Sequence, residues 1–226
     1  MGRLSRRLPL LGLLLGLLWT HQGWAATEPC QESEVHPEDI DLDRPKDQLA
    51  RQADLVIPPG ATIGEVRIHN RPIFDTDKPG QDNALYRLLN WLNVSTWDSA
   101  LASQLTFSSG DLFRAGDLAE SERILRGRNY LTAAWVSPVR VCGDEVDVAV
   151  LVRDTWTLFP SAGISRSGGE NTSTVGVSDP NFLGSGKSLA ISRTRDADRT
   201  TTSFSAQDPN LFGSRWQADL GYENRS

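Results

Sequence analysis

Long apolar runs are scarce in this sequence of 226 residues. The run from Leu8 to Trp19 is too short to span a bilayer as a helix, and no other segment approaches 18 continuous apolar residues. Basic residues are also in the minority. The formal net charge is −6, and it becomes −9 when the three arginines among the first 25 residues are left out. Nucleic-acid binding needs a basic surface, so the composition argues against nucleic acid as the main partner and against a helical anchor downstream.

Residues typical of catalytic and metal sites are few. No Gly-x-Ser-x-Gly motif of a nucleophile elbow occurs. The chain has three histidines, none of them at metal-ligand spacing from another: His21, His36 and His69. Asp111, Asp117 and Glu120 lie close in sequence, but helix caps and exposed helix positions explain them better than an acid/base pair. We therefore expect no catalytic residues, no cofactor and no metal.

A glycine-rich stretch, Leu183 to Ser188, resembles the end of a phosphate-binding loop. The full motif requires glycine where this chain has Asn181, and it requires a helix after the loop. Leu189 to Ser192 alternates instead like a strand. We expect these glycines to serve a turn.

Cysteine is limited to Cys30 and Cys142. An even number permits a disulfide in an oxidising compartment. Cys142 lies in a predicted turn, and Cys30 lies in a predicted mobile arm that could reach it. Because a sequence does not give the distance between Cα atoms, pairing and free thiols both remain open.

The first 60 residues divide into two segments. Residues 1–25 have the charged start, apolar centre and small residues of a secretory signal peptide, with cleavage expected after Ala25; an uncleaved anchor is the alternative. Residues 26–60 are polar and acidic and end at Pro58-Pro59-Gly60. We expect a flexible, solvated arm there, with an acidic docking segment as the alternative.

Residues 61–154 combine strand and helix patterns. Strands are expected near 63–68, 130–141 and 145–152, the last two forming a hairpin. Helices are expected over about 85–92 and from Asp117 onward, the latter with Glu122 and Arg126 at i,i+4, and residues 98–105 offer a further short helix. The order strand, helix, helix, strand, strand predicts a small α+β layer with one core.

Residues 155–226 show only alternating patterns. The clearest is the last, in which Trp216, Ala218, Leu220 and Tyr222 alternate with polar residues. Strands of about ten residues with aromatic residues near both ends are typical of a membrane β-barrel. A soluble antiparallel sandwich is the alternative, because it alternates in the same way.

A six-residue motif occurs twice in this region. Asp179-Pro-Asn-Phe-Leu-Gly184 recurs 29 residues later as Asp208-Pro-Asn-Leu-Phe-Gly213. Such a spacing indicates a repeated unit, and it leaves room for a hairpin of two strands. Proline, asparagine and glycine are turn residues, with asparagine and glycine accepting the left-handed region. The expected turn residues are Asp179, Asn181, Gly184, Asp208, Asn210 and Gly213.

Several stretches, taken together and in order, resemble the superfamily of outer-membrane assembly factors and bacterial surface antigens. They are Ile63 to Ile68, Leu105 to Asp111, Glu120 to Arg126, Val146 to Val150, Asp154 to Trp156, Ser167 to Asn171 and the Asn-Phe-Leu-Gly-Ser-Gly turn. The resemblance covers about residues 61–226.

The resemblance implies a POTRA-like α+β domain (β-α-α-β-β) at 61–154 in the periplasm. It is followed at 155–226 by antiparallel strands of an incomplete transmembrane β-barrel in the outer membrane. Barrels of this family have many more strands than the five or so expected here, so the chain resembles an N-terminal piece of a longer protein. The implied partners are outer-membrane lipid, unfolded or nascent polypeptides and other envelope assembly proteins.

The resemblance also implies a polypeptide-binding edge on the strand from about Ala134 to Val141, through Ala134, Trp135, Val136, Val139 and Val141. Extended segments bind such an edge by β-augmentation. Pro138 interrupts its row of hydrogen-bonding groups, which fits an edge strand. The implied function is insertion or translocation of polypeptides at the outer membrane. The alternatives are a periplasmic binding module anchored by a barrel without transport activity, and an exported enzyme on a β scaffold.

Overall fold

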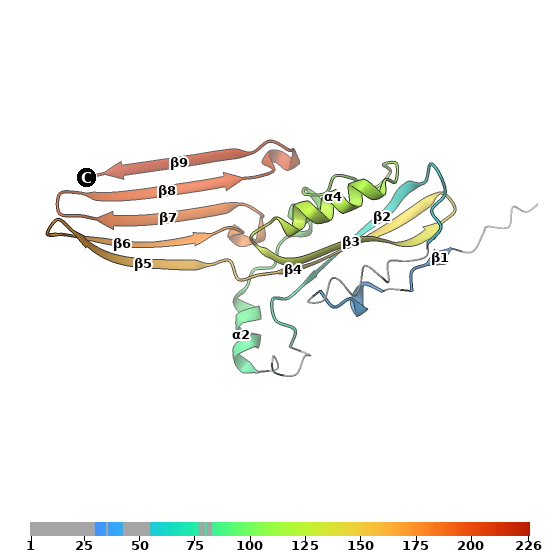
Figure 1. The fold of residues 1–226 in the computed structure, drawn as a ribbon, viewed down its shortest axis with the longest axis horizontal. Coiled ribbons are helices and arrows are strands. Elements are labelled where there is room, and N and C mark those ends of the chain that lie inside the picture. Colours follow the sequence, from blue (N-terminus) through green and yellow to red (C-terminus); the bar gives the residue numbers. More distant parts are fainter. Residues whose placement is uncertain (1–29, 35, 43–54, 77–79, 81–82) are drawn as a thin grey trace, which may run out of the picture.

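The computed structural model describes residues 30–34, 36–42, 55–76, 80 and 83–226. The predicted signal peptide and its cleavage site lie outside these residues. The chain consists mostly of antiparallel strands with few helices, arranged as two sheets end to end (Figure 1). Within the described ranges, no helix has the length and apolarity that a membrane crossing would require.

The first sheet has four strands in the order β1-β3-β4-β2. Their bounds are β1 Gln31–Glu32, β2 Thr62–Arg71, β3 Leu131–Cys142 and β4 Glu145–Asp154. β3 and β4 form an antiparallel hairpin, and β2 pairs with β4 in parallel. The three strands expected between 61 and 154 are therefore present, close to the expected residues.

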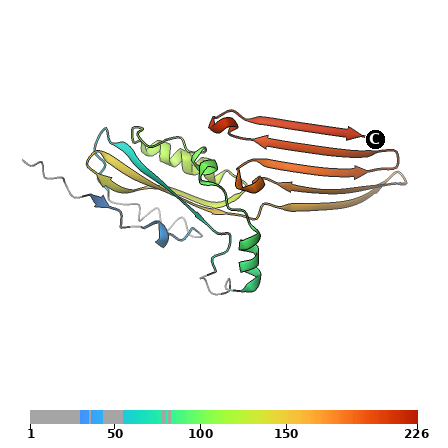
Figure 2. The ribbon, with the colours of Figure 1, turned by 180° about the vertical axis from the view of Figure 1, so that it is seen from behind.

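Helices α3 (Asp98–Ala102) and α4 (Ala115–Arg126) cover one face of this sheet, and α4 lies along it in both views (Figures 1 and 2). α2 (Ala84–Leu92) projects away from the sheet, and its Leu85 and Leu88 side chains are exposed. The core between α4 and the strands includes Leu125, Val148 and Val150. The prediction that Asp117 caps α4 was wrong. The helix begins two residues earlier, after Arg114, and Asp117 lies in its first turn, where a carboxylate suits the helix dipole.

The opposite face of the sheet is covered by residues 37–42, which include a short 3-10 helix, η1 (Pro37–Asp39). Ile40 and Leu42 are only 2% and 6% exposed, and they pack with Trp135 and Leu151. This part of the chain differs from the solvated arm expected from its charge. The apolar side chains of β3 and β4 that face away from α4 need cover, and Ile40 and Leu42 supply it.

The second sheet contains five strands in sequence order, each antiparallel to the next. They are β5 (Phe159–Ser167), β6 (Glu170–Asp179), β7 (Ser188–Arg195), β8 (Thr200–Asp208) and β9 (Ala218–Arg225). The sheet is open, with β5 and β9 at its two sides. Its strands are 8 to 10 residues long, slightly shorter than expected. The alternating pattern was expected from residue 155, but β5 begins at Phe159, and the Thr155 amide still donates to the Tyr130 carbonyl next to the first sheet.

The register of the second sheet places apolar side chains on one face and polar side chains on the other. One row of cross-strand partners is Pro160, Val177, Ile191, Phe204 and Tyr222. The adjacent row on the opposite face is Ser161, Gly176, Ser192, Ser203 and Glu223. Partners across a sheet point to the same face, so one face is apolar and the other is small and polar.

Candidate functional site

The outer edge of β3, which faces away from β4, is the candidate polypeptide-binding edge. Near its start, two side chains of α4 occupy its main-chain groups. The Val136 amide donates to the Glu122 carboxylate at 2.9 Å, and the Arg126 guanidinium donates to the Ala134 carbonyl at 3.0 Å. Arg126 and Glu122 also form an ion pair at 2.8 Å. A donor and an acceptor of α4 thus stand where the main chain of an added strand would bind.

Near its end, the same edge is paired with β1. Gln31 and Glu32 pair antiparallel with Val141 and Arg140, and the Ser33 amide donates to the Val139 carbonyl at 2.8 Å. Cys30 and Cys142 form a disulfide whose Cα atoms are 4.4 Å apart. The pairing that the sequence left open is therefore made, and it joins the start of β1 to the end of β3.

The side chains of the predicted edge residues are turned into the protein. Ala134 and Val136 are buried beneath α4, and Trp135 is buried on the opposite face. Between Pro138 and Arg140 the register with β4 shifts, which divides the edge into two parts. Recognition at this edge would therefore use main-chain groups, which suits a sequence-tolerant site.

Glu122 and Arg126 were not predicted as edge residues. Their i,i+4 spacing was visible in the sequence, and their ion pair is confirmed. What the sequence did not show is that this face of α4 meets the β3 edge, because that depends on how the helix packs on the sheet.

Replacing Glu122 by alanine should expose the Val136 amide to solvent. A hydrogen bond to a charged group contributes about 1.5–3 kcal/mol, so the Val136 amide should exchange with deuterium at least about tenfold faster. Hydrogen exchange of the full chain, read on peptides that contain β3, measures this rate.

The matched control is Glu120→Ala on the same helix. Glu120 bonds Arg123 at 2.6 and 2.7 Å in solvent, and these bonds lower the pKa of Glu120 below its usual value. Neither residue has a bond to β3 among the described contacts. Unchanged exchange of Val136 in the Glu122 variant, or equal acceleration in the control, would contradict the assignment of Glu122 as an edge cap.

The repeated motifs form two turns with the same geometry. In each turn, the carboxylate of the aspartate accepts a hydrogen bond from the main-chain amide of the asparagine, at 2.9 Å for Asp179 and 3.0 Å for Asp208. The residues with positive φ are the glycine and the residue before it, Leu183 in one copy and Phe212 in the other. The asparagines themselves do not use the left-handed region that their residue type tolerates: φ is −136° at Asn181 and −140° at Asn210.

In the first turn, the side chain of Asn181 binds Thr96, in the segment that packs on the first sheet. Its amide donates to the Thr96 hydroxyl at 2.7 Å, while its carbonyl oxygen accepts from the Gly186 amide at 2.7 Å. The Trp97 amide also donates to the Gly184 carbonyl at 2.8 Å. The turn is thus fixed to the segment that precedes α3.

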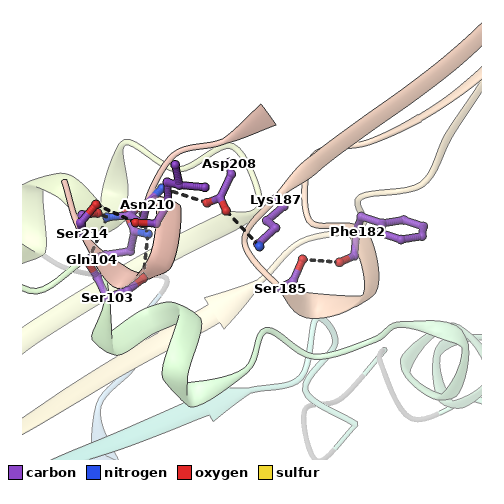
Figure 3. Close-up of polar contacts among 9 residues, drawn as sticks. Ser103, Gln104, Phe182, Ser185, Lys187, Asp208, Asn210 and Ser214 are labelled. Carbon is purple, nitrogen blue, oxygen red and sulfur yellow. Dashed lines mark hydrogen bonds and ion pairs between the residues drawn. The ribbon is translucent and has the colours of Figure 1, made fainter. Parts of the chain in front are cut away.

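The second turn binds the other end of α3. Asn210 donates to the Ser103 carbonyl at 3.1 Å and accepts from the Gln104 amide (Figure 3). The two turns are joined to each other by an ion pair of 2.9 Å between Lys187 and Asp208 (Figure 3). The motifs therefore dock the second sheet on α3 as well as reversing the chain.

Asp154, at the end of β4, organises the first of these contacts. Its carboxylate is 1% exposed and accepts from the Thr96 amide at 2.9 Å, the Thr96 hydroxyl at 2.6 Å and the Asn70 side chain at 3.0 Å. The Thr96 hydroxyl in turn accepts from Asn181. The stretch from Asp154 to Trp156 was visible in the sequence, but the role of Asp154 was not, since its partners lie 58 and 84 residues away.

Tyr130 lies near this junction, with its hydroxyl facing Gly186 of the first turn. Burial raises the pKa of the Tyr130 phenol, whose oxygen is buried without a hydrogen-bond partner in the described part of the chain. Among the described residues, no group of three or more His, Cys, Asp or Glu side chains could hold a metal ion. What the arrangement offers chemically is main-chain hydrogen bonding along β3 and a rigid joint at α3.

No protein-family model matches the chain, and no curated protein sequence matches it. Among solved structures, the chain is similar to the crystal structure of BamA from Haemophilus ducreyi lacking POTRA domains 1-3, with 20% identity over 71% of this chain and a TM-score of 0.46. It is also similar to CdiB from Acinetobacter baumannii, with 12% identity over 72% of this chain and a TM-score of 0.46. The chain spans 27% of the length of each.

Proposed function

We propose that this chain belongs to an outer-membrane protein that inserts or translocates polypeptides, with residues 155–226 in the membrane and residues 61–154 in the periplasm. The observation that carries the proposal is the two-faced second sheet. Its apolar row exposes Val177, Ile191 and Tyr222, with Tyr222 64% exposed. Exposed apolar side chains in such a row need an apolar partner.

Lipid is the partner that fits this sheet. Strands of a membrane β-barrel point apolar residues outward and polar residues toward a wet interior, in strict alternation. Further along β7, β8 and β9, away from the repeated turns, this face becomes polar at the cross-strand partners Arg193, Thr202 and Asn224, while Val175 and Ala162 keep the same row apolar on β6 and β5. An apolar band that ends in polar residues matches a bilayer core that ends at its headgroups.

The first sheet and its helices are the part of the chain to which we assign polypeptide binding. Its strands and helices follow the order expected of a POTRA-like domain, with the short α3 in addition. β3 offers an outer edge held by side chains and by a two-residue strand. Such an edge binds extended segments through main-chain hydrogen bonds, which is how a module can accept unfolded clients of different sequence. We assign this unit no catalytic role.

Cysteine labelling in native membranes tests the lipid-facing row. Ile191 and Ser192 are neighbours on β7 that point to opposite faces, so Ile191→Cys and Ser192→Cys form a matched pair. A hydrophilic, membrane-impermeant maleimide should react with the Ser192 variant through the aqueous interior. It should leave the Ile191 variant unlabelled until detergent is added, because a lipid-buried thiol is not ionised.

Labelling is done without reductant, so that the Cys30–Cys142 disulfide stays closed. The parent chain, with no added cysteine, gives the background. Equal labelling of both variants in intact membranes would contradict a lipid-facing row. The same result together with full recovery in the soluble fraction would favour a soluble sandwich.

A further inference from the structure

The face of the first sheet opposite α4 holds a segment of polypeptide that follows the short strand β1 and passes through the 3-10 helix η1. Residues 30–34 and 36–42 cross this face and are fixed mainly through their main chain. Arg71 of β2 donates to three carbonyl oxygens of the segment, those of Pro37, Glu38 and Ile40, each at 2.7 Å. A guanidinium with several donors in one plane can bind several carbonyls at once, whatever side chains they carry.

An apolar shelf lies next to Arg71. This shelf consists of Trp135, Ala149 and Leu151. Ile40 and Leu42 of the segment pack against it. Beside this contact the face stays hollow, as an open cavity of about 790 Å³ lined in part by His69, Val139 and Leu151. The segment thus fills only part of the surface on which it lies.

The segment also continues onto the β3 edge. β1 adds to the end of β3, and the disulfide joins Cys30 to Cys142 at the point where that pairing begins. A strand of two residues makes few hydrogen bonds and is weak by itself. The covalent link raises its effective concentration at the edge, which keeps the edge occupied.

We propose that this surface is a binding site for an unfolded polypeptide segment, composed of the Arg71 clamp, the Trp135 shelf and the end of the β3 edge, and that residues 30–34 and 36–42 occupy it until a dithiol reductant opens the Cys30–Cys142 disulfide. The proposal rests on the proposed function, from which it takes the class of ligand. The ligand that fits is an unfolded segment with exposed carbonyls and two apolar side chains spaced as Ile40 and Leu42 are.

The opening step is thiol–disulfide exchange. A thiolate of the reductant attacks one sulfur of the disulfide and forms a mixed disulfide, while the other protein sulfur leaves as a thiolate and takes a proton. The second thiol of the reductant then displaces the remaining protein sulfur. Cys30 and Cys142 end as two thiols, and the dithiol ends as a disulfide, so two electrons and two protons pass to the protein.

Binding of a polypeptide that cannot fold tests the proposal. The probe is a fluorescently labelled polypeptide whose cysteines have been reduced and carboxymethylated, added to the full chain in its native membrane. Affinity should rise at least about tenfold when dithiothreitol is added, and equally in a Cys30→Ser, Cys142→Ser double variant without reductant, because the competing segment then keeps only its main-chain connection to β2 and leaves the site more often. Arg71→Gln in the double variant should remove most of this gain.

A second variant keeps the test independent of the cysteines. Ile40→Ser with Leu42→Ser weakens the segment while the disulfide stays closed, and it too should raise affinity for the probe. Hydrogen exchange of Val148 and Val150, which are fully buried in β4, checks that each variant is folded. If the Cys30→Ser, Cys142→Ser variant loses that protection, the Ile40→Ser, Leu42→Ser variant decides the result.

Equal affinity in the oxidised, reduced and Ile40/Leu42 variants would overturn the self-occupied site and leave the proposed function standing. A gain that survives Arg71→Gln would overturn the clamp. Failure of the proposed function appears separately, as equal maleimide labelling of the Ile191 and Ser192 variants, a readout that does not involve residues 30–42.

Discussion

Replacing Gly184 by alanine should destabilise the chain by about 3 kcal/mol, whereas the same change at Gly213 should cost only about 1 kcal/mol. Both glycines have positive φ, +75° and +71°, so both substitutions carry similar backbone strain. At Gly184 a Cβ would lie 2.2 Å from the Ser95 carbonyl oxygen. At Gly213 nothing lies within 4 Å. The difference measures how closely the first turn packs on the segment before α3.

The change in the free energy of unfolding is obtained from denaturant titration of the full chain, followed by tryptophan fluorescence. The two variants share a motif, a turn geometry and a substitution, so each serves as the control for the other. Proteolysis at the Phe182–Leu183 bond gives a local readout, since both side chains are already exposed and a displaced first turn frees the backbone that is held against the segment before α3. Equal destabilisation by the two variants would contradict the close contact between Gly184 and Ser95.

Replacing Asp154 by alanine should have a comparable or larger effect, about 3–5 kcal/mol. The carboxylate is buried, and it accepts from the amide and the hydroxyl of Thr96 and from the side chain of Asn70. Removing it leaves these buried donors without their acceptor, which costs more than the bonds themselves contribute. Because Asn181 bonds to the same Thr96 hydroxyl, the first turn should loosen as well.

Asp144→Ala is the control for this substitution. Asp144 lies in the exposed turn between β3 and β4, so the same change there should alter the free energy of unfolding by less than about 0.5 kcal/mol. Denaturant midpoints give the comparison, and hydrogen exchange at Thr96 reports the local loss. A cost at Asp154 no greater than that at Asp144 would show that the buried network contributes little.

The substitutions at Gly184 and Asp154 both affect the contact between the two sheets. Both the Gly184 contact and the Asp154 network hold the start of the second sheet against the segment around α3. The second motif adds Asn210, which binds the far end of α3, and Lys187 and Asp208 link the two turns. A joint with this many hydrogen bonds and packing contacts fixes the position of the second sheet relative to the first.

Local patterns predicted the elements of this chain well. Alternation marked the five strands of the second sheet, because neighbouring side chains of a strand point to opposite faces. β-branched runs marked β2, β3 and β4, and the spaced leucines marked α2. The 29-residue repeat predicted two equivalent turns, and they agree even in the positive φ of Leu183 and Phe212. These features depend on residues near one another in sequence.

The roles of side chains could not be predicted in the same way. Charge predicted that residues 37–42 are solvated, but Ile40 and Leu42 pack on Trp135 and Leu151, and all four side chains are buried. The repeat predicted Asn181 and Asn210 as turn residues, but it did not show that their side chains bind partners 85 and 107 residues away. Glu122 and Arg126 read as a surface pair, yet they cap the edge of β3.

The sequence by itself determined the strands, the main helices, the period of the second sheet and the two residues able to form a disulfide. Only the tertiary structure decided which groups meet: Cys30 with Cys142, Asp154 with Thr96, and Arg71 with the carbonyls of residues 37–40. The physical reason is that local propensity acts over a few residues, whereas burial and hydrogen bonding select partners across the whole chain. The repeated turn therefore defines a hairpin in sequence and a joint in the folded protein.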